Sequence, residues 1–556
     1  MNSTAAAPIG GEKGEAYMQE WWKEAVVYQI YPRSFCDSNG DGIGDLPGII
    51  SRLDDLKDLG VNVLWLSPVY PSPNEDNGYD ISDYCGIHPD YGTMEDMERL
   101  IREAGARGIR IIMDLVINHT STAHPWFQAS RNPESSYRNF YYWRKADKKG
   151  RLPNNWTGFF GEDCWAYDER SDSYYLHLFA KHQADLNYHE PRVLEEVKKI
   201  LRFWLDKGIA GFRCDVINLL WKDTLESAPK KLILTGSEHY ISRPGLHPIL
   251  RQLRQVLDEY DAFSVGETVF VTTEMARDLC APERRELNTV FGFEHMECDQ
   301  RLVKWFKTPL RWSRFMKTLA RWQQEVPWNT VYLENHDQPR SIPRFGSRSY
   351  YMESGKLLAT LVLTLRGTPF LYQGQEIGMD NFDFTSMEQV QDVESHNIYR
   401  LMKKLGMPGG MRWKLIRSTS RDNARTPMQW DATPGAGFTR GKPWLGINGN
   451  YKSINVAAQK DDPHSLRSWY KKLIALRSKT PALLHGEFRL LQATDQLAAY
   501  QRIGEDETLT ILLNCSDEMQ KTPYHGQTVC SSYGGTAFDG TLLPWEAVIL
   551  RGVETP

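Results

Sequence analysis

Strand-like and helix-like segments alternate along most of the chain, and this alternation restricts the fold more than any other feature of the sequence. Short β-branched and aromatic runs separated by helical patterns are typical of βαβ units with a parallel sheet. Eight such runs predict an α/β fold, a (β/α)8 TIM barrel that carries insertions. The expected strands are residues 26–31, 62–67, 109–116, 210–216, 262–267, 287–291, 329–335 and 369–374.

Helix-start and helix-stop signals lie between the expected strands. Pro47 and Gly60 bracket one amphipathic segment, and Thr93 with Asp96 three residues later opens another. Gly367 follows a third such segment, where a glycine commonly ends a helix. We expect helices over 47–60, 93–107, 354–366 and 465–477.

Two intervals are too long to be ordinary loops. Residues 119–187, between the third and fourth strands, are rich in aromatic residues and predict an inserted subdomain. The alternating runs that follow residue 486 are typical of an antiparallel β-sandwich. The expected domains are a tail over 1–20, the barrel over 21–118 and 188–485 with an insertion at about 378–455, subdomain B over 119–187, and a C-terminal β-sandwich over 486–556.

Composition excludes several classes of protein. Lys and Arg number 66 against 71 Asp and Glu, so the chain has no basic footprint for nucleic acid or an anionic membrane. No run of 18 apolar residues suggests a membrane span, and the start lacks the pattern of a secretory signal. The 8 cysteines are scattered without a CxxC pair. We therefore expect a cytoplasmic protein with reduced thiols.

Carboxylates stand where several of the expected strands end. Asp215 ends the fourth strand, Glu267 ends the fifth, and Asp337 follows the seventh. A single carboxylate at a strand end is usually a loop or cap residue, but the C-terminal ends of barrel strands meet at one mouth. Two or three carboxylates converging there are what cleavage of a glycosidic bond needs.

The sequence around these carboxylates resembles a known family. DLVINHT, GFRCDVIN, GET and NHDQPR are similar to the four short conserved regions of the α-amylase superfamily, glycoside hydrolase family 13, and QADLN is similar to its fifth region. VVYQIYPRSF, SNGDGIGDL, NGYDISDY and RDNARTPMQW resemble the oligo-1,6-glucosidase and α-glucosidase branch. That branch includes sucrose isomerases and trehalose-6-phosphate hydrolases. The resemblance extends over essentially the whole chain.

The resemblance implies a role for each carboxylate. Asp215 would be the nucleophile, Glu267 the general acid/base, and Asp337 the group that holds the donor glucose and stabilises the transition state. The reaction would retain configuration through a covalent β-glucosyl-enzyme, with the carboxyl groups of Asp215 and Glu267 about 5–5.5 Å apart. Arg213, two residues before the nucleophile, would share its strand face and keep Asp215 ionised.

Further residues are implied in binding the terminal glucose. His119 and His336 are similar to donors to glucose hydroxyls in the family. Tyr79, Asp80 and Arg421 are similar to the residues that close the pocket behind the non-reducing glucose. A closed pocket implies exo action on short oligosaccharides, with starch a poor substrate.

The expected function is hydrolysis of terminal α-glucosyl units from a small oligosaccharide. Val216 directly follows the nucleophile, and a valine at this position resembles the family members that prefer α-1,6 bonds. A sucrose isomerase or other transglucosylase and a trehalose-6-phosphate hydrolase are the alternatives, although residues 296–305 do not match the Arg-rich loop of the isomerases. A non-catalytic relative is disfavoured because all three carboxylates are present. We expect a monomer or a weak homo-oligomer.

One loop resembles a metal site. Oxygen-bearing side chains alternate over residues 37–45, as in the first part of an EF-hand loop, but the closing Glu of an EF-hand is missing. The resemblance implies a structural Ca2+ or Mg2+ ion, and the alternative is an Asx-rich turn without a metal. The implied ligands are the side chains of Asp37, Asn39, Asp41 and Asp45 and the carbonyl of Ile43.

The chain departs from the family pattern at a few positions. Cys214 precedes the nucleophile, and on an alternating strand its side chain is expected to pack away from Asp215. Gln375 replaces a common Glu, which leaves Glu376 as the carboxylate of that segment. The strings GEDCW and GETVFV also depart from the family pattern, so the contacts beyond the first glucose are not predicted.

Overall fold

The computed structural model describes residues 20–535 and 537–553. The tail expected over 1–20 lies outside these residues, apart from Glu20.

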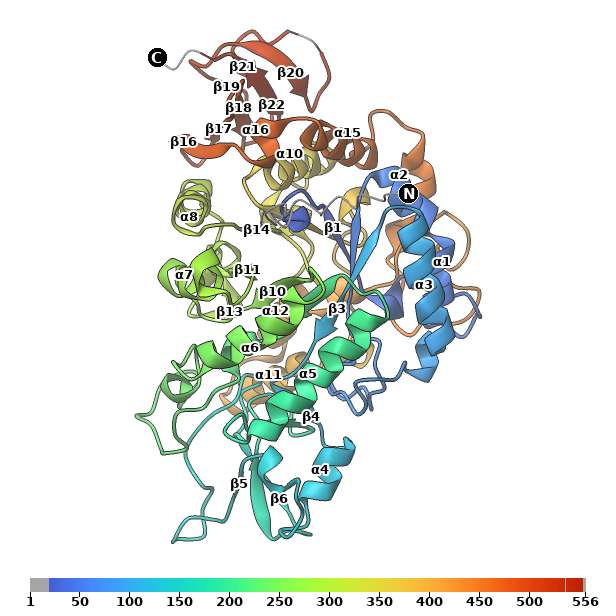
Figure 1. The fold of residues 1–556 in the computed structure, drawn as a ribbon. Coiled ribbons are helices and arrows are strands. Elements are labelled where there is room, and N and C mark those ends of the chain that lie inside the picture. The colour runs from blue at the N-terminus through green and yellow to red at the C-terminus, as the bar shows by residue number, and fades with distance from the viewer. Residues whose placement is uncertain (1–19, 536, 554–556) are drawn as a thin grey trace, which may run out of the picture.

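Eight parallel strands form the central sheet, as predicted (Figure 1). Their order in the sheet is β11-β10-β9-β3-β2-β1-β15-β14. The two outer strands also meet, because Thr330 Oγ1 donates to the carbonyl of Val290 at 3.0 Å. The sheet is thereby closed into the (β/α)8 barrel. The strands are β1 (Val27–Ile30), β2 (Val63–Leu66), β3 (Arg110–Leu115), β9 (Gly211–Cys214), β10 (Phe263–Glu267), β11 (Thr289–Phe291), β14 (Thr330–Val331) and β15 (Thr368–Tyr372).

Helices surround the barrel, and one differs from its prediction. The segment expected as a single helix over 47–60 is two helices, because Arg52 leaves helical geometry at φ −111° and ψ 5°. The capping box of Thr93 and Asp96 is present as predicted. The helices are α1 (Leu46–Ser51), α2 (Leu53–Leu59), α3 (Met94–Ala106), α5 (Pro191–Asp206), α6 (Leu246–Asp258), α7 (Thr273–Cys280), α8 (Trp312–Glu325), α9 (Ser341–Phe345), α10 (Tyr351–Thr364), α14 (Val456–Lys460), α15 (Leu466–Ser478) and α16 (Pro481–Leu484).

Residues 119–187 form short antiparallel strands beyond one end of the barrel (Figure 1). One two-stranded sheet joins the first and last of these strands, and a three-stranded sheet has the order β5-β7-β6. The sequence pattern did not predict these strands, which are only 2 to 4 residues long. The elements are β4 (His119–Ser121), α4 (Pro125–Ser130), β5 (Trp143–Arg144), β6 (Trp165–Asp168), β7 (Ser173–Leu176) and β8 (Gln183–Asp185).

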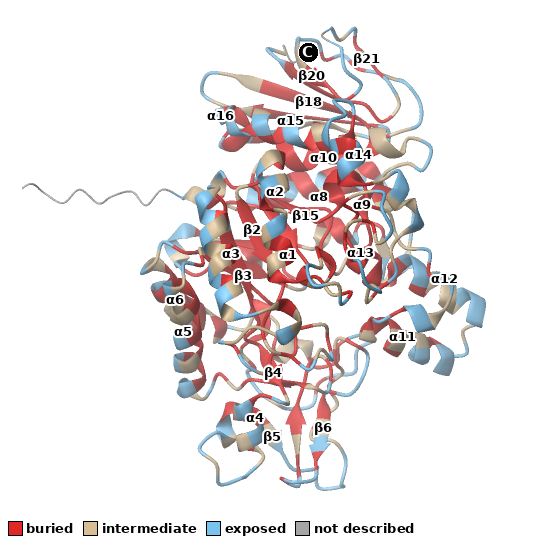
Figure 2. Ribbon diagram, turned by 90° about the vertical axis from the view of Figure 1, so that its right-hand side faces the viewer, coloured by how far each residue is buried: buried red, intermediate tan, exposed pale blue. Residues whose placement is uncertain are grey.

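The interval expected as an insertion after the last barrel strand contains three α-helices: α11 (Val393–Lys404), α12 (Gly409–Thr419) and α13 (Asp422–Arg425). In Figure 2, α11 and α12 project from the side of the barrel. They share a hydrophobic cluster with the hairpin of β12 (Gln300–Arg301) and β13 (Val303–Lys307).

The C-terminal residues form an antiparallel sheet, as predicted. Five strands run in the order β16-β17-β18-β22-β20, and β19 pairs with β21 in a second, smaller sheet. Tyr500 on one face belongs to the main core, while Leu512 on the other face packs with Leu542 of the smaller sheet. The strands are β16 (Glu487–Ala493), β17 (Leu497–Ile503), β18 (Thr508–Asn514), β19 (Gln520–Lys521), β20 (Gln527–Ser531), β21 (Thr541–Leu542) and β22 (Ala547–Arg551).

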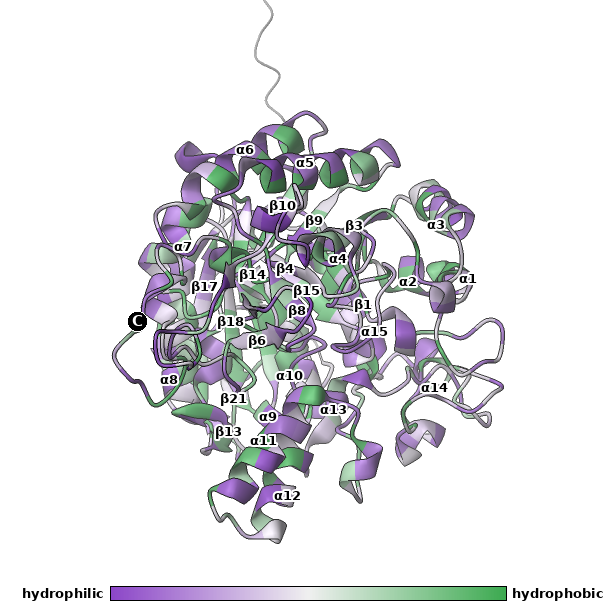
Figure 3. Cartoon of the chain, turned by 90° about the horizontal axis from the view of Figure 1, so that it is seen from below, coloured by the Kyte–Doolittle hydropathy of each residue, from purple (hydrophilic) through white to green (hydrophobic). Residues whose placement is uncertain are grey.

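One continuous hydrophobic cluster fills the barrel and reaches the C-terminal sheet. Buried residues follow the strands and the inner faces of the helices (Figure 2), and hydrophilic residues mark the outer turns of α5 and α6 (Figure 3). None of the described helices is long and apolar enough to cross a membrane. All eight cysteines have free thiols.

Candidate active site

Three barrel strands bring the predicted catalytic carboxylates to one mouth. Asp215 follows β9, Glu267 is the last residue of β10, and Asp337 lies on the loop after β14. Arg213 joins two of them, because one guanidinium nitrogen lies 2.6 Å from Asp215 Oδ1 and the other lies 2.7 Å from Glu267 Oε2. Asp114 of β3 is a third partner at 2.6 Å. The single buried guanidinium therefore holds Asp215 and Glu267 close to each other.

Burial gives the two paired carboxylates different proton affinities. It raises the pKa of Asp215 to about 6, although Arg213 acts in the opposite direction. It raises the pKa of Glu267 to about 7, again against Arg213 and with the help of the charges of Asp215 and Asp337. Arg213 therefore favours the ionised form of Asp215 as expected, but it does not bring the pKa below the ordinary value. Carboxylates separated in this way can divide acid and nucleophile roles at neutral pH.

Val216 has an unusual backbone at this site. Its φ of 35° and ψ of 41° lie in the left-handed region, which is strained for a β-branched residue. Its backbone N–H donates to Glu267 Oε2 at 3.2 Å. The residue after the predicted nucleophile thus contacts the predicted acid/base.

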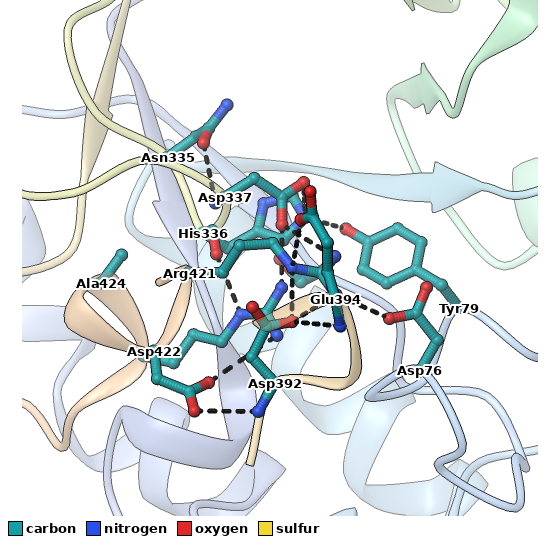
Figure 4. A network of polar contacts seen from close by, with 12 residues as sticks. Asp76, Tyr79, Asn335, His336, Asp337, Asp392, Glu394, Arg421, Asp422 and Ala424 are labelled. Atoms are coloured by element: carbon teal, nitrogen blue, oxygen red, sulfur yellow. Dashed lines mark hydrogen bonds and ion pairs between the residues drawn. The ribbon is translucent and has the colours of Figure 1, made fainter. Parts of the chain in front are cut away.

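Two arginines hold Asp337, and Figure 4 labels one of them, Arg421. Arg425 donates to Asp337 Oδ1 at 2.8 Å, and Arg421 reaches the same oxygen at 3.4 Å. The charges of Arg421 and Arg425 act against burial, and the pKa of Asp337 lies well below its usual range. Arg421 Nε donates in turn to Asp392 at 2.8 Å. Asp337 is therefore a permanent anion at the mouth.

A stacked pair of rings forms the floor beside Asp337. The rings of Tyr79 and His336 are 5.2 Å apart and nearly parallel, and Tyr79 Oη lies 2.7 Å from His336 Nε2. Burial lowers the pKa of His336 to about 3, so this imidazole is neutral. His119 lies next to Tyr79, with its Nε2 3.0 Å from the Tyr79 carbonyl. The structure thus brings these three predicted binding residues together.

Asp80 does not lie in the pocket, and this corrects the expectation from the NGYD string. Its buried carboxylate accepts hydrogen bonds from Ser72 Oγ and from the backbone N–H groups of Glu75 and Asp76. Asp76 instead contacts Arg421, with Oδ1 3.1 Å from the guanidinium. Asp80 therefore holds the turn that presents Asp76 and Tyr79.

Sequence reasoning missed several residues of this network. Arg425 belongs to the RDNAR string, and Asp114 lies in DLVINHT one residue before the end of β3, so the sequence pointed to both without giving either a role. Asp392 caps the N-terminus of α11 and had no recognisable motif. Each of these residues orders a charged group of the pocket.

A buried ion pair connects residues 119–187 to the loop after the nucleophile. Lys222 Nζ lies 2.7 Å from Asp185 Oδ2 on β8, and neither side chain is exposed. Asn118 Oδ1 and the carbonyl of Leu219 accept from the same ammonium group at 3.0 and 2.9 Å. The ammonium therefore fixes β8 against the segment that carries Asp215.

The loop expected to bind a metal is a series of Asx turns. Asp37 Oδ1 accepts from the N–H groups of Asn39 and Gly40, and Asp41 accepts from that of Ile43. Asp45 caps α1 by accepting from the N–H of Gly48. No group of three or more His, Cys, Asp or Glu side chains among the described residues is arranged to hold a metal ion. The carboxylate and amide oxygens of this loop are the ligands that Ca2+ prefers. A cation bound to the loop remains a prediction.

Cys214 and Glu376, the two side chains noted beside the departures from the family pattern, lie away from the three carboxylates. Cys214 packs in the main hydrophobic core, as expected for a strand residue that alternates with Asp215. Glu376 is buried and accepts from Tyr28 Oη at 2.9 Å. Neither side chain contacts the three carboxylates.

The chain is similar to known proteins over most of its length. The family described as alpha amylase, catalytic domain, matches residues 29–486. A protein from Halalkalibacterium halodurans named oligo-1,6-glucosidase is 50% identical over 507 residues, which cover 89% of this chain and 90% of the relative. A trehalose-6-phosphate hydrolase from Bacillus subtilis is 44% identical, with 89% of both chains covered. The structure of an isomaltulose synthase mutant from Erwinia rhapontici in complex with sucrose has a TM-score of 0.93 at 39% identity, covering 96% of this chain and 99% of that one. The chain belongs to the α-amylase family, glycoside hydrolase family 13.

Proposed function

We propose that this protein is a retaining, exo-acting α-glucosidase that removes terminal α-glucosyl units from short oligosaccharides with α-1,6 bonds. The observation that carries the proposal is the guanidinium of Arg213, which holds Asp215 and Glu267 side by side at the barrel mouth. The oligo-1,6-glucosidase name of relatives at 44 to 50% identity supports the same activity.

The proposed reaction has two steps. Asp215 attacks the anomeric carbon while Glu267 gives its proton to the leaving oxygen, and a covalent β-glucosyl-enzyme forms. Glu267 then removes a proton from water, which attacks the same carbon and releases glucose with the original configuration. A pKa of about 7 suits Glu267 to both proton transfers. Asp337 remains ionised and stabilises positive charge on the sugar ring.

Exo action follows from the groups behind the sugar. Arg421 contacts both Asp337 and Asp76, so a buried ion-pair network closes this side of the pocket. Tyr79 and His336 stack beside the same network. We propose that these groups bind the hydroxyls of one terminal glucose and leave no room for a chain that continues past it.

Incubation with isomaltose, maltose, sucrose and trehalose 6-phosphate, followed by chromatography of the products, tests the proposal. Glucose from isomaltose, with little reaction of the other three sugars, is the expected result. Isomaltulose or trehalulose from sucrose would make the protein an isomerase, and glucose 6-phosphate from trehalose 6-phosphate would make it a phosphotrehalase. A structural divalent cation, a monomeric or weakly oligomeric state and a cytoplasmic location remain predictions beside this activity.

A further inference from the structure

Phe270 combines two features that are unfavourable for folding. Its side chain is 56% exposed, although burying a phenylalanine contributes about 1.5–3 kcal/mol. Its φ of 54° lies in the left-handed region, which a bulky residue rarely adopts. Phe270 lies on the loop after β10, three residues beyond Glu267. An exposed ring on a strained backbone so near the acid/base indicates a role in function.

The loop that carries Phe270 is fixed to the segment that carries the nucleophile. Asn218, in the 3-10 helix Ile217–Leu219 after Asp215, accepts from the N–H of Val269 at 3.1 Å. The amide of the same side chain donates to the carbonyl of Val269 at 2.9 Å. Phe270 therefore has a set position relative to both catalytic loops.

A line of ring contacts leads from the glucose pocket to Phe270. Phe179 lies 5.3 Å from the His119 ring and stacks on Phe159 at 4.7 Å with an interplanar angle of 11°. Phe159 in turn lies 6.5 Å from Phe270 at an angle of 28°. His119 is buried and Phe270 is exposed, so the line runs outward from the site of the bound glucose.

We propose that Phe270, together with Phe159, is the platform for the sugar ring on the leaving side of the scissile bond. The inference rests on the proposed function and names the residue that recognises the second sugar. Aromatic faces bind the C–H face of a pyranose through apolar contact, which requires no charge on the sugar. The same platform holds a sugar acceptor when the glucosyl-enzyme transfers glucose instead of reacting with water. Phe270 is therefore a specificity-determining residue.

Two variants at Phe270 and two substrates test the inference. Phe270→Ala removes the ring, and Phe270→Asn removes it with a residue that tolerates the left-handed region. The leaving group of isomaltose is a sugar, whereas the leaving group of α-glucosyl fluoride is a fluoride ion, which cannot contact an aromatic platform in the way a sugar ring does. The ratio of kcat/KM for isomaltose to that for the fluoride is expected to fall about tenfold in both variants, mainly through KM, which corresponds to about 1.4 kcal/mol of lost binding. Transfer to added isomaltose should fall in parallel.

Tyr167→Ala is the matched control, because Tyr167 is 51% exposed and lies on β6, away from this line of rings. Its ratio should stay at the wild-type value. An unchanged ratio in both Phe270 variants, or an equal loss for both substrates, would overturn the inference while leaving the α-glucosidase proposal standing. A wild-type protein that cleaves neither substrate would overturn the proposed function and the inference with it.

Discussion

The backbone N–H of Val216 donates a hydrogen bond to Glu267 Oε2 at 3.2 Å. This contact connects the residue after the nucleophile to the acid/base, at a residue whose backbone lies in the left-handed region. The guanidinium of Arg213, two residues before the nucleophile, forms an ion pair with the same oxygen at 2.7 Å. The residue expected to influence linkage preference therefore contacts the acid/base directly, which leads to the first prediction.

Val216→Thr is expected to raise the ratio of kcat/KM for maltose to that for isomaltose. Threonine keeps the branched shape and the backbone N–H, so the contact with Glu267 should remain and the alkaline limb of the pH profile should not move. The hydroxyl that replaces one methyl group makes the side chain polar next to the expected nucleophile. Initial rates on the two disaccharides measure the effect, and a constant ratio would show that Val216 does not set linkage preference.

Asp215→Asn and Glu267→Gln should each reduce kcat on isomaltose by about 10²–10⁴-fold or more, the range for loss of an acid/base or nucleophile. Both substitutions keep the shape of the side chain, so the melting temperature should change little. Ser418 lies on an exposed face of α12, so Ser418→Ala serves as a control variant that should keep the wild-type turnover. Near-normal turnover in either carboxylate variant would contradict the assignment.

Most of the barrel could be predicted because its strands are periodic and its helices carry local start and stop signals. All eight strands were expected from runs that are buried in the structure. The break at Arg52 was not expected, because the apolar spacing continues across it from Ile49 to Leu56. Local periodicity therefore predicts the presence of a helix well, but it does not show whether that helix is interrupted.

The pocket was only partly predictable because its charged groups come from distant segments. Arg421 meets Asp76 across 345 positions of sequence, and no local pattern identifies such a pair. The choice between Asp76 and Asp80 depends on a turn in which Asn77 and Gly78 both have positive φ. Spacing alone cannot show which carboxylate such a turn presents to the pocket. The carboxylates at strand ends were predictable because the barrel fixes the direction of its strands.

The pH dependence of kcat/KM should be bell-shaped with a narrow optimum. Glu267 must be protonated to act as an acid, so activity should fall as the pH rises through its pKa of about 7. Asp215 must be ionised to attack, so activity should fall as the pH drops through its pKa of about 6. Because both carboxylates share Arg213, the two limbs report values for the pair. Initial rates on isomaltose between pH 4 and 9 measure both limbs, because departure of the sugar oxygen requires the proton of Glu267. A flat profile with chemistry rate-limiting would contradict the assignment.

Lys222→Met should lower the free energy of unfolding by about 3–5 kcal/mol, because it leaves the buried carboxylate of Asp185 without its cation. Lys145→Met is the matched control, since the Lys145 to Asp172 pair is exposed and is expected to contribute about 1 kcal/mol or less. Denaturant unfolding of the two variants measures the difference. Equal stability losses would show that the buried pair does not hold residues 119–187 in place.

Removal of divalent cations should lower the melting temperature and leave turnover at 25 °C nearly unchanged. The loop over 37–45 contacts a distant segment, because the N–H of Asp37 donates to the carbonyl of Phe438 at 2.9 Å and Thr439 donates to its carboxylate. A cation on these oxygens would offset repulsion among the carboxylates and stabilise this contact, which lies apart from Asp215 and Glu267. Thermal unfolding after dialysis against a chelator, with metal content measured and Ca2+ or Mg2+ then restored, is the test. The melting temperature is expected to fall after dialysis and to recover when either cation is restored. In the Asp41→Asn variant, the chelator should lower the melting temperature less than in the wild type. An unchanged melting temperature after verified removal would mean that the Asx turns hold this loop without a metal.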